Sequence, residues 1–128
     1  MYPYASLATI ACVALYNATV LGVGAARRKH GVSAPATDGP PDFQVRLRVQ
    51  MNTLEQLAVA LPAIWLCAIW VGDGWAGLGG GAWFVGRALY ARAYVAAPSK
   101  RGPGFILAML ATTAMLLAAT LAAIAHLI

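Results

Sequence analysis

Three polar residues near the middle of the chain could form one wall of a binding site. Arg48, Asn52 and Glu55 are spaced i, i+4 and i+7, which places them on one face of a helix. A carboxylate can bind an amine, a guanidinium a carboxylate, and a carboxamide a peptide group. The set predicts the wall of a polar pocket; the alternative is a stabilising network within one helix near the membrane interface.

A second set lies about 35 residues further along the chain. Arg87, Tyr90 and Tyr94 are spaced i, i+3 and i+7 and also share a helical face. The alternative here is an interfacial aromatic belt with a snorkelling arginine. A turn at Pro98 is expected to bring Arg101 back towards the same end, and a cation beside a thiol lowers the pKa of the thiol and favours the reactive thiolate.

The elements that carry these residues have the composition of a membrane protein. Hydrophobic residues make up 61% of the 128 residues and charged residues 10%, against roughly 45–50% and about 25% in soluble domains. The net charge of +5 could suggest nucleic acid, but the basic residues flank apolar runs, so membrane topology explains them better and we expect no nucleic-acid partner.

We expect a single all-α domain over residues 1–128, built as a bundle of four transmembrane helices. The expected spans are about residues 4–26, 43–72, 75–97 and 104–128. Each is long enough to cross a hydrocarbon core of about 30 Å. We expect the first span to be retained rather than cleaved as a signal peptide, because no basic residue precedes it and its apolar run exceeds the usual signal length.

Prolines, glycines and aspartates mark the connections between the spans. Three prolines and two glycines make Gly31–Pro41 a loop, and Asp42 is a plausible N-cap of the second helix. Pro62 should kink that helix. Asp73-Gly74 is expected to end it in a short turn, and Pro98–Gly104 to form the turn before the last span.

The basic residues also predict the orientation in the membrane. They gather at the first and third connections and are absent from the two termini and the second connection: Arg27, Arg28, Lys29, Arg46, Arg48, Lys100 and Arg101. Four spans place the first and third connections on one side, which the positive-inside rule makes cytoplasmic, with both termini outside. For a bacterial protein this would be the inner membrane.

The remaining polar and sulfur-containing residues have simpler interpretations. We expect Asn17 to make an interhelical hydrogen bond, and His126 to be solvated at the outer interface. Cys12 and Cys67 lie inside apolar stretches and are expected to be buried as small hydrophobic residues. No Cys or His spacing indicates a metal site. Small residues in the first and last spans would allow close helix contact, also between subunits, and a homo-oligomer would create a pocket between protomers.

The stretch from Arg46 to Pro62, RLRVQMNTLEQLAVALP, resembles the second-helix signature of the MAPEG family, the membrane-associated proteins of eicosanoid and glutathione metabolism. Its core is Arg-x-x-x-Asn-x-x-Glu. The segments GPPDF at 39–43 and Ala26-Arg-Arg are similar to the leukotriene-forming branch, and PSKRGPGF at 98–105 to bacterial members. The resemblance covers nearly the whole chain.

The resemblance implies a homotrimer of four-helix protomers that binds glutathione between neighbouring subunits near the cytoplasmic side. Arg101 matches the arginine that activates the thiol, and Arg28 a second arginine that assists the chemistry. The residues implied for glutathione binding are Arg27, Arg48, Gln50, Asn52, Glu55, Arg87, Tyr90 and Tyr94.

The chain departs from the family pattern at two positions. Gln56 follows Glu55 where the synthase branch often has an aromatic residue, and Thr113 lies near the position of a tryptophan that caps the lipid substrate. A smaller or unspecified hydrophobic electrophile is therefore expected rather than a lipid-mediator precursor.

Three functions remain open on these residues. The leading hypothesis is a membrane-bound transferase or peroxidase that uses glutathione or a similar small thiol, for which detoxification is the expected role. The alternative is a non-catalytic binding or scaffold protein on the same fold. A small multidrug-type transporter is disfavoured because Glu55 lies towards the cytoplasmic end of its helix rather than at mid-membrane.

Overall fold

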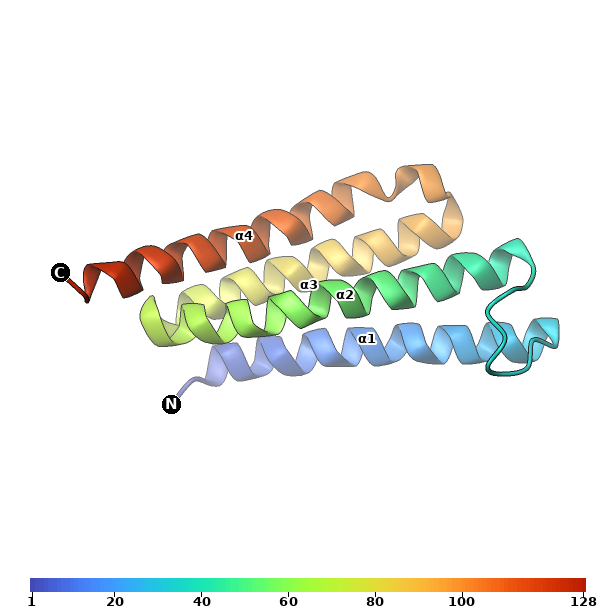
Figure 1. The fold of residues 1–128 in the computed structure, drawn as a ribbon, viewed down its shortest axis with the longest axis horizontal. Coiled ribbons are helices and arrows are strands. Elements are labelled where there is room, and N and C mark those ends of the chain that lie inside the picture. The colour runs from blue at the N-terminus through green and yellow to red at the C-terminus, as the bar shows by residue number, and fades with distance from the viewer.

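The chain is entirely helical. The computed structural model describes all of residues 1–128, and its four long helices are α1 (Pro3–His30), α2 (Pro41–Trp70), α3 (Asp73–Ala96) and α4 (Gly102–Ala125), with a 3₁₀ turn, η1 (Pro98–Lys100), before α4. The helices lie side by side and alternate in direction, and both termini lie at the same end (Figure 1). This arrangement confirms the predicted all-α bundle of four helices.

Three of the four helical segments are long and apolar enough to cross a membrane. They are Pro3–His30, Pro41–Trp70 and Pro98–Ala125. The remaining helix, α3, carries a glycine-rich start and two arginines, Arg87 and Arg92, which lower its hydrophobicity. The prediction of four apolar spans therefore holds for three helices, and α3 differs because its glycines and arginines make it less apolar.

The junction between α1 and α2 differs from the prediction in two ways. The basic residues Arg27 to Lys29 do not follow the first helix but form its last turn, which ends at Gly31 in the left-handed conformation (φ 65°). Asp42 does not cap α2, because Pro40 occupies the N-cap position and Pro41 begins the helix. The Asp42 carboxylate pairs with basic side chains instead.

The turn between α2 and α3 is also shifted. Asp73 does not end α2 but begins α3, and the turn lies at Val71-Gly72, where Gly72 has a φ of 139° that other residues rarely adopt. The Asp73 carboxylate accepts the backbone N–H groups of Tyr4 (3.0 Å) and Ala5 (2.8 Å) at the start of α1. An anion there satisfies two helix-end donors and complements the helix dipole.

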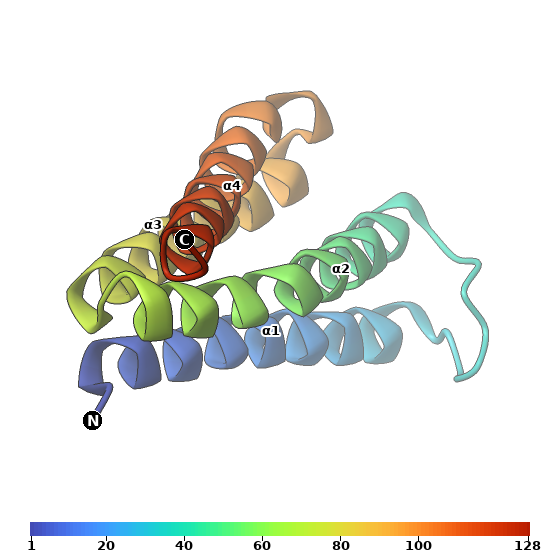
Figure 2. The ribbon, with the colours of Figure 1, turned by 60° about the vertical axis from the view of Figure 1, so that its left-hand side comes forward.

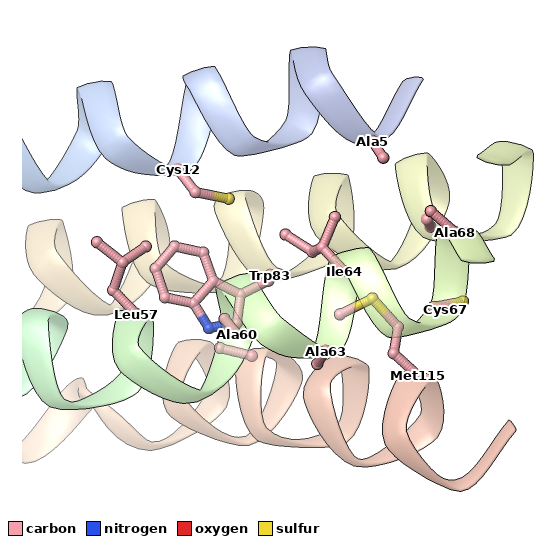
Figure 3. Close-up of a cluster of buried hydrophobic side chains, with 12 residues drawn as sticks. Ala5, Cys12, Leu57, Ala60, Ala63, Ile64, Cys67, Ala68, Trp83 and Met115 are labelled. Carbon is pink, nitrogen blue, oxygen red and sulfur yellow. The ribbon is translucent and has the colours of Figure 1, made fainter. Parts of the chain in front are cut away.

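The core lies mainly in the half of the bundle that holds the termini. Twelve buried residues form one cluster centred on Trp83, which is fully buried beside Cys12, Leu57 and Ile64 (Figure 3). Towards the two basic connections the α1–α2 pair and the α3–α4 pair diverge (Figure 2), and the second cluster there contains only Val23, Ala26 and Phe43. The bundle is thus closed at one end and more open at the other.

Candidate functional site

The polar face of α2 points away from the rest of the protomer. Val49, Thr53 and Leu57 are the buried residues of this stretch and face the other helices. Arg48 and Glu55 are exposed on the opposite side, and Asn52 is half-buried between the two faces. The predicted common face is therefore present, but it forms an outer wall of the protomer rather than the lining of an internal cavity.

Only part of the alternative network within α2 forms. The Asn52 Nδ2 atom donates a hydrogen bond to Glu55 Oε2 at 3.3 Å, whereas Arg48 makes no hydrogen bond or ion pair. The Asn52 Oδ1 atom is buried without a partner. This face therefore keeps a free guanidinium, a carboxylate and a carboxamide oxygen with hydrogen-bonding capacity left over.

The second predicted set forms a continuous stack. The Arg87 guanidinium lies 3.9 Å from the centre of the Tyr90 ring, and the Tyr90 and Tyr94 rings are 5.5 Å apart. The Arg101 guanidinium lies 5.2 Å from the centre of the Tyr94 ring, as the turn at Pro98 predicted. We call these four residues, Arg87, Tyr90, Tyr94 and Arg101, the cation–aromatic ladder.

The two arginines of the ladder have opposite environments. Arg101 is exposed, and its guanidinium makes one hydrogen bond, to the Pro98 carbonyl at 3.2 Å. Arg87 is fully buried and donates to Thr53 Oγ1 at 2.8 Å, while its Nε and Nη1 atoms have no partner. A buried guanidinium without a carboxylate is costly, which makes Arg87 a candidate functional residue.

The other three predicted site residues lie on the α1–α2 side. The Arg27 guanidinium donates to the carbonyls of Val32 (3.4 Å) and Ala36 (2.8 Å) and stacks on Phe43 at 4.9 Å. The Gln50 amide donates to the Tyr16 hydroxyl at 3.0 Å. Arg28 is exposed and forms no ion pair. Within one protomer none of the three bonds to the ladder or to the Asn52–Glu55 pair.

The structure adds two polar residues that sequence reasoning missed, Thr53 and Tyr16, and gives Asp42 a different role. Thr53 joins α2 to Arg87 and Tyr16 joins α1 to Gln50. Asp42 accepts hydrogen bonds from His30 (2.9 Å), Lys29 (3.2 Å) and Arg46 (3.2 Å). These partners hold the pKa of the Asp42 carboxyl well below its usual range. In the sequence, only the i, i+4 spacing of Asp42 and Arg46 indicated that these charged side chains pair.

The remaining sequence predictions have mixed outcomes. Cys12 and Cys67 are buried, as predicted, and the Cys12 thiol lies 3.7 Å from the Gly80 carbonyl. His126 is exposed, as predicted, and packs edge-on against Trp70. The interhelical bond predicted for Asn17 is absent from the protomer, because this residue is exposed on the outside of α1. No three His, Cys, Asp or Glu side chains lie together.

A helical bundle with three segments that are long and apolar enough to cross a membrane, and with ionisable side chains towards one end, is typical of an integral membrane protein. The sequence matches the model of the MAPEG family over residues 5–121, and the chain belongs to this family.

Three relatives illustrate the range of the family. An uncharacterized protein of the cyanobacterium Synechocystis sp. is 44% identical over 116 residues, which cover 91% of this chain and 85% of that protein. Human microsomal glutathione S-transferase 2 is 34% identical over 77% of this chain and 66% of its own length. Leukotriene C4 synthase of Cavia porcellus is 32% identical over 79% of this chain and 67% of its own length. The chain thus spans about two thirds of the length of the two enzymes.

Proposed function

We propose that the protein is a homotrimeric membrane enzyme that binds glutathione, or a similar small thiol, between protomers and transfers it to a hydrophobic electrophile. The observation that carries the proposal is the outward polar face of α2. Arg48, Asn52 and Glu55 lie on the side of α2 away from the bundle, where lipid would leave ionisable groups without partners. A second copy of the chain and a zwitterionic ligand between the copies would supply those partners.

The proposed membrane topology has four crossings. A helix of 24 residues such as α3 is about 36 Å long at 1.5 Å per residue, enough for a core of about 30 Å. It connects two apolar helices through short turns and lies antiparallel to both, so it must return through the bilayer. The basic connections would face the cytoplasm of a bacterial cell and both termini the outside.

The ligand groups of glutathione match the outward face of α2. Glu55 would hold the α-amino group, Arg48 a carboxylate and Asn52 a peptide group, each by a charge-assisted or amide hydrogen bond. Arg27, Arg28 and Gln50 would approach from the neighbouring protomer, since they lie on the α1–α2 side and make no contact with the ladder of their own chain. The shared site would explain why the predicted residues stay apart in one protomer.

The ladder would place a cation beside the thiol. Arg101 is exposed at its end, and its guanidinium would lower the pKa of the thiol so that the proton passes to water. The thiolate sulfur then forms a bond to the electrophilic carbon, and the leaving group departs with the electron pair of its broken bond. With a lipid hydroperoxide, two thiols would instead give a disulfide, an alcohol and water.

The test is thiol conjugation by the full chain in lipid nanodiscs, with glutathione and a chloro-nitroaromatic substrate. Arg101→Ala should lower kcat/KM about 100-fold, the usual effect of losing a group that stabilises an anion. Lys100→Ala is the matched control, because it removes an exposed cation one residue away, and should change kcat/KM less than twofold. If the wild type and Arg101→Ala are equally inactive, and glutathione does not protect the protein from unfolding, the proposed enzymatic function is wrong.

One observation favours a non-catalytic scaffold as the second candidate. Arg27 and Gln50 are already engaged inside the protomer, with loop carbonyls and with Tyr16, so both could be structural. In that case glutathione would bind without turnover. Measuring binding by calorimetry beside turnover on the same preparation separates the two functions.

A further inference from the structure

An open groove is lined by residues of α1, α2 and α3. It lies towards the end of the bundle at which the α1–α2 pair and the α3–α4 pair diverge; the divergence is seen in Figure 2. Its volume is about 540 Å³, within the range of about 300–1,000 Å³ typical of small-molecule sites. Small residues on both walls create the space, among them Ala18 and Gly22 on α1 and Ala88 and Ala91 on α3. The groove is therefore an apolar channel open to the outside of the bundle.

Two cations line the part of this groove that lies towards the basic connections. Arg46 lies about 8 Å from the start of α2 and Arg92 about 6 Å from the end of α3, at 1.5 Å per residue. Arg92 is exposed and forms no ion pair. Arg46 pairs with Asp42 through Nε, which leaves its two terminal nitrogens available.

The groove is separate from the proposed thiol site. Arg46 and Val49 contribute to the groove, whereas Arg48 and Glu55 lie roughly 100–180° away from them around α2 at 100° per residue. Trimer formation through the outward face of α2 would therefore leave the groove open to lipid.

We propose that this groove binds one anionic phospholipid, with the phosphate between Arg46 and Arg92 and an acyl chain along α1 and α3. The wall that α1 contributes, from Leu15 to Gly22, is about 10 Å long, which is about two thirds of the depth of one leaflet, whose hydrocarbon half is about 15 Å thick. Both arginines lie at the depth where side chains snorkel to the headgroups. Charge and length together fit a lipid of the leaflet at the basic end of the bundle.

The first experiment is native mass spectrometry of the full chain released from bilayers of phosphatidylglycerol and phosphatidylcholine. Wild type should retain phosphatidylglycerol in preference to phosphatidylcholine. Arg92→Gln should reduce that preference about fivefold, the effect of one arginine near a charged surface. Lys100→Gln, which removes an exposed cation at the same end but outside the groove, should retain it. Equal loss in both variants would mean general attraction to the surface and would overturn the proposal.

The second experiment fills the groove without touching its charges. A Cβ atom added at Gly22 or at Gly24 would meet no atom within 4 Å, so the backbone accepts a larger residue at either position. Only Gly22 lines the groove. Gly22→Leu should abolish phosphatidylglycerol retention, and Gly24→Leu should leave it unchanged.

Two results of the second experiment would contradict the proposal. If Gly22→Leu keeps the lipid, the groove is not its site. If Gly22→Leu changes the number of copies in the complex, a second chain rather than lipid covers the groove. Thiol binding measured on the same variants should stay at the wild-type level, so failure of the lipid site is distinguishable from failure of the proposed function.

Discussion

The two halves of the bundle differ in how many side chains they bury and in how many polar groups they leave without partners. The half with the termini holds a cluster of twelve buried residues, and an aspartate at its end caps a neighbouring helix. The half with the basic connections has a buried cluster of three residues, a buried unpaired arginine and an outward polar face. The first half therefore holds most of the buried core, whereas the second leaves ionisable groups without partners inside the protomer, and we propose that a ligand binds there.

The largest expected effect comes from breaking the closed half. Trp83→Ala should lower the free energy of unfolding by roughly 2–4 kcal/mol, because it leaves a cavity at the centre of the core, although lipid weakens the apolar driving force. Trp83→Phe is the matched control and should cost under about 1.5 kcal/mol, since the indole N–H has no partner to lose. Unfolding in mixed detergent measures both, and equal losses would show that the ring does not fill the core.

The same kind of change in the open half should affect the ligand instead of the fold. Arg87→Met replaces a buried cation that has one hydrogen bond, so the free energy of unfolding should stay level or rise. Glutathione binding should weaken about tenfold because the ladder loses its buried end, a cost of about 1.4 kcal/mol. Calorimetry and unfolding on one preparation check this. A large loss of stability with unchanged glutathione binding would show that Arg87 stabilises the fold and does not contribute to the ligand site.

A smaller effect is expected at the cap in the closed half. Asp73→Ala should lower the free energy of unfolding by about 1 kcal/mol, because two backbone N–H groups of α1 lose their acceptor. Asp73→Asn keeps an acceptor oxygen and should recover about half of the loss. Hydrogen exchange at Tyr4 and Ala5 gives a local reading, and unchanged exchange in Asp73→Ala would show that water replaces the cap.

The smallest effect is a pH dependence at the basic connection. His30, Lys29 and Arg46 lower the pKa of Asp42 in the folded protein. The ionised carboxylate therefore contributes fully to the free energy of unfolding above the ordinary carboxyl pKa of about 3.9, and this contribution is lost as the pH falls towards the pKa of the folded protein. Asp42→Asn should therefore lower Tm at pH 6 and flatten its decline between about pH 4 and pH 2. An identical decline in both proteins would exclude Asp42 as its source.

The sequence predicted what depends on spacing within one helix. The four helices, the face shared by Arg48 and Glu55, and the return of Arg101 to Tyr94 follow from periodicity and a proline turn. Helix ends were less predictable, because the predicted cap, Asp42, and the predicted turn residue, Asp73, each bind a partner on another helix.

The direction in which a face points could not be predicted from spacing. Periodicity groups Arg48, Asn52 and Glu55 together but does not say whether they face the bundle or its surroundings, which depends on how α2 packs on α1, α3 and α4. The same holds for Arg87, whose burial against Thr53 required the rotation of two helices to be known.

The proposed function requires that a second copy of the chain covers the outward face of α2 and that glutathione binds between the copies. Both requirements can be measured together by native mass spectrometry of the full chain in lipid, with and without glutathione. We expect three chains that bind up to three glutathione molecules, and Glu55→Gln should keep the three chains but lose the ligand. A single chain that binds glutathione, or three chains whose glutathione binding is unaffected by Glu55→Gln, would contradict it.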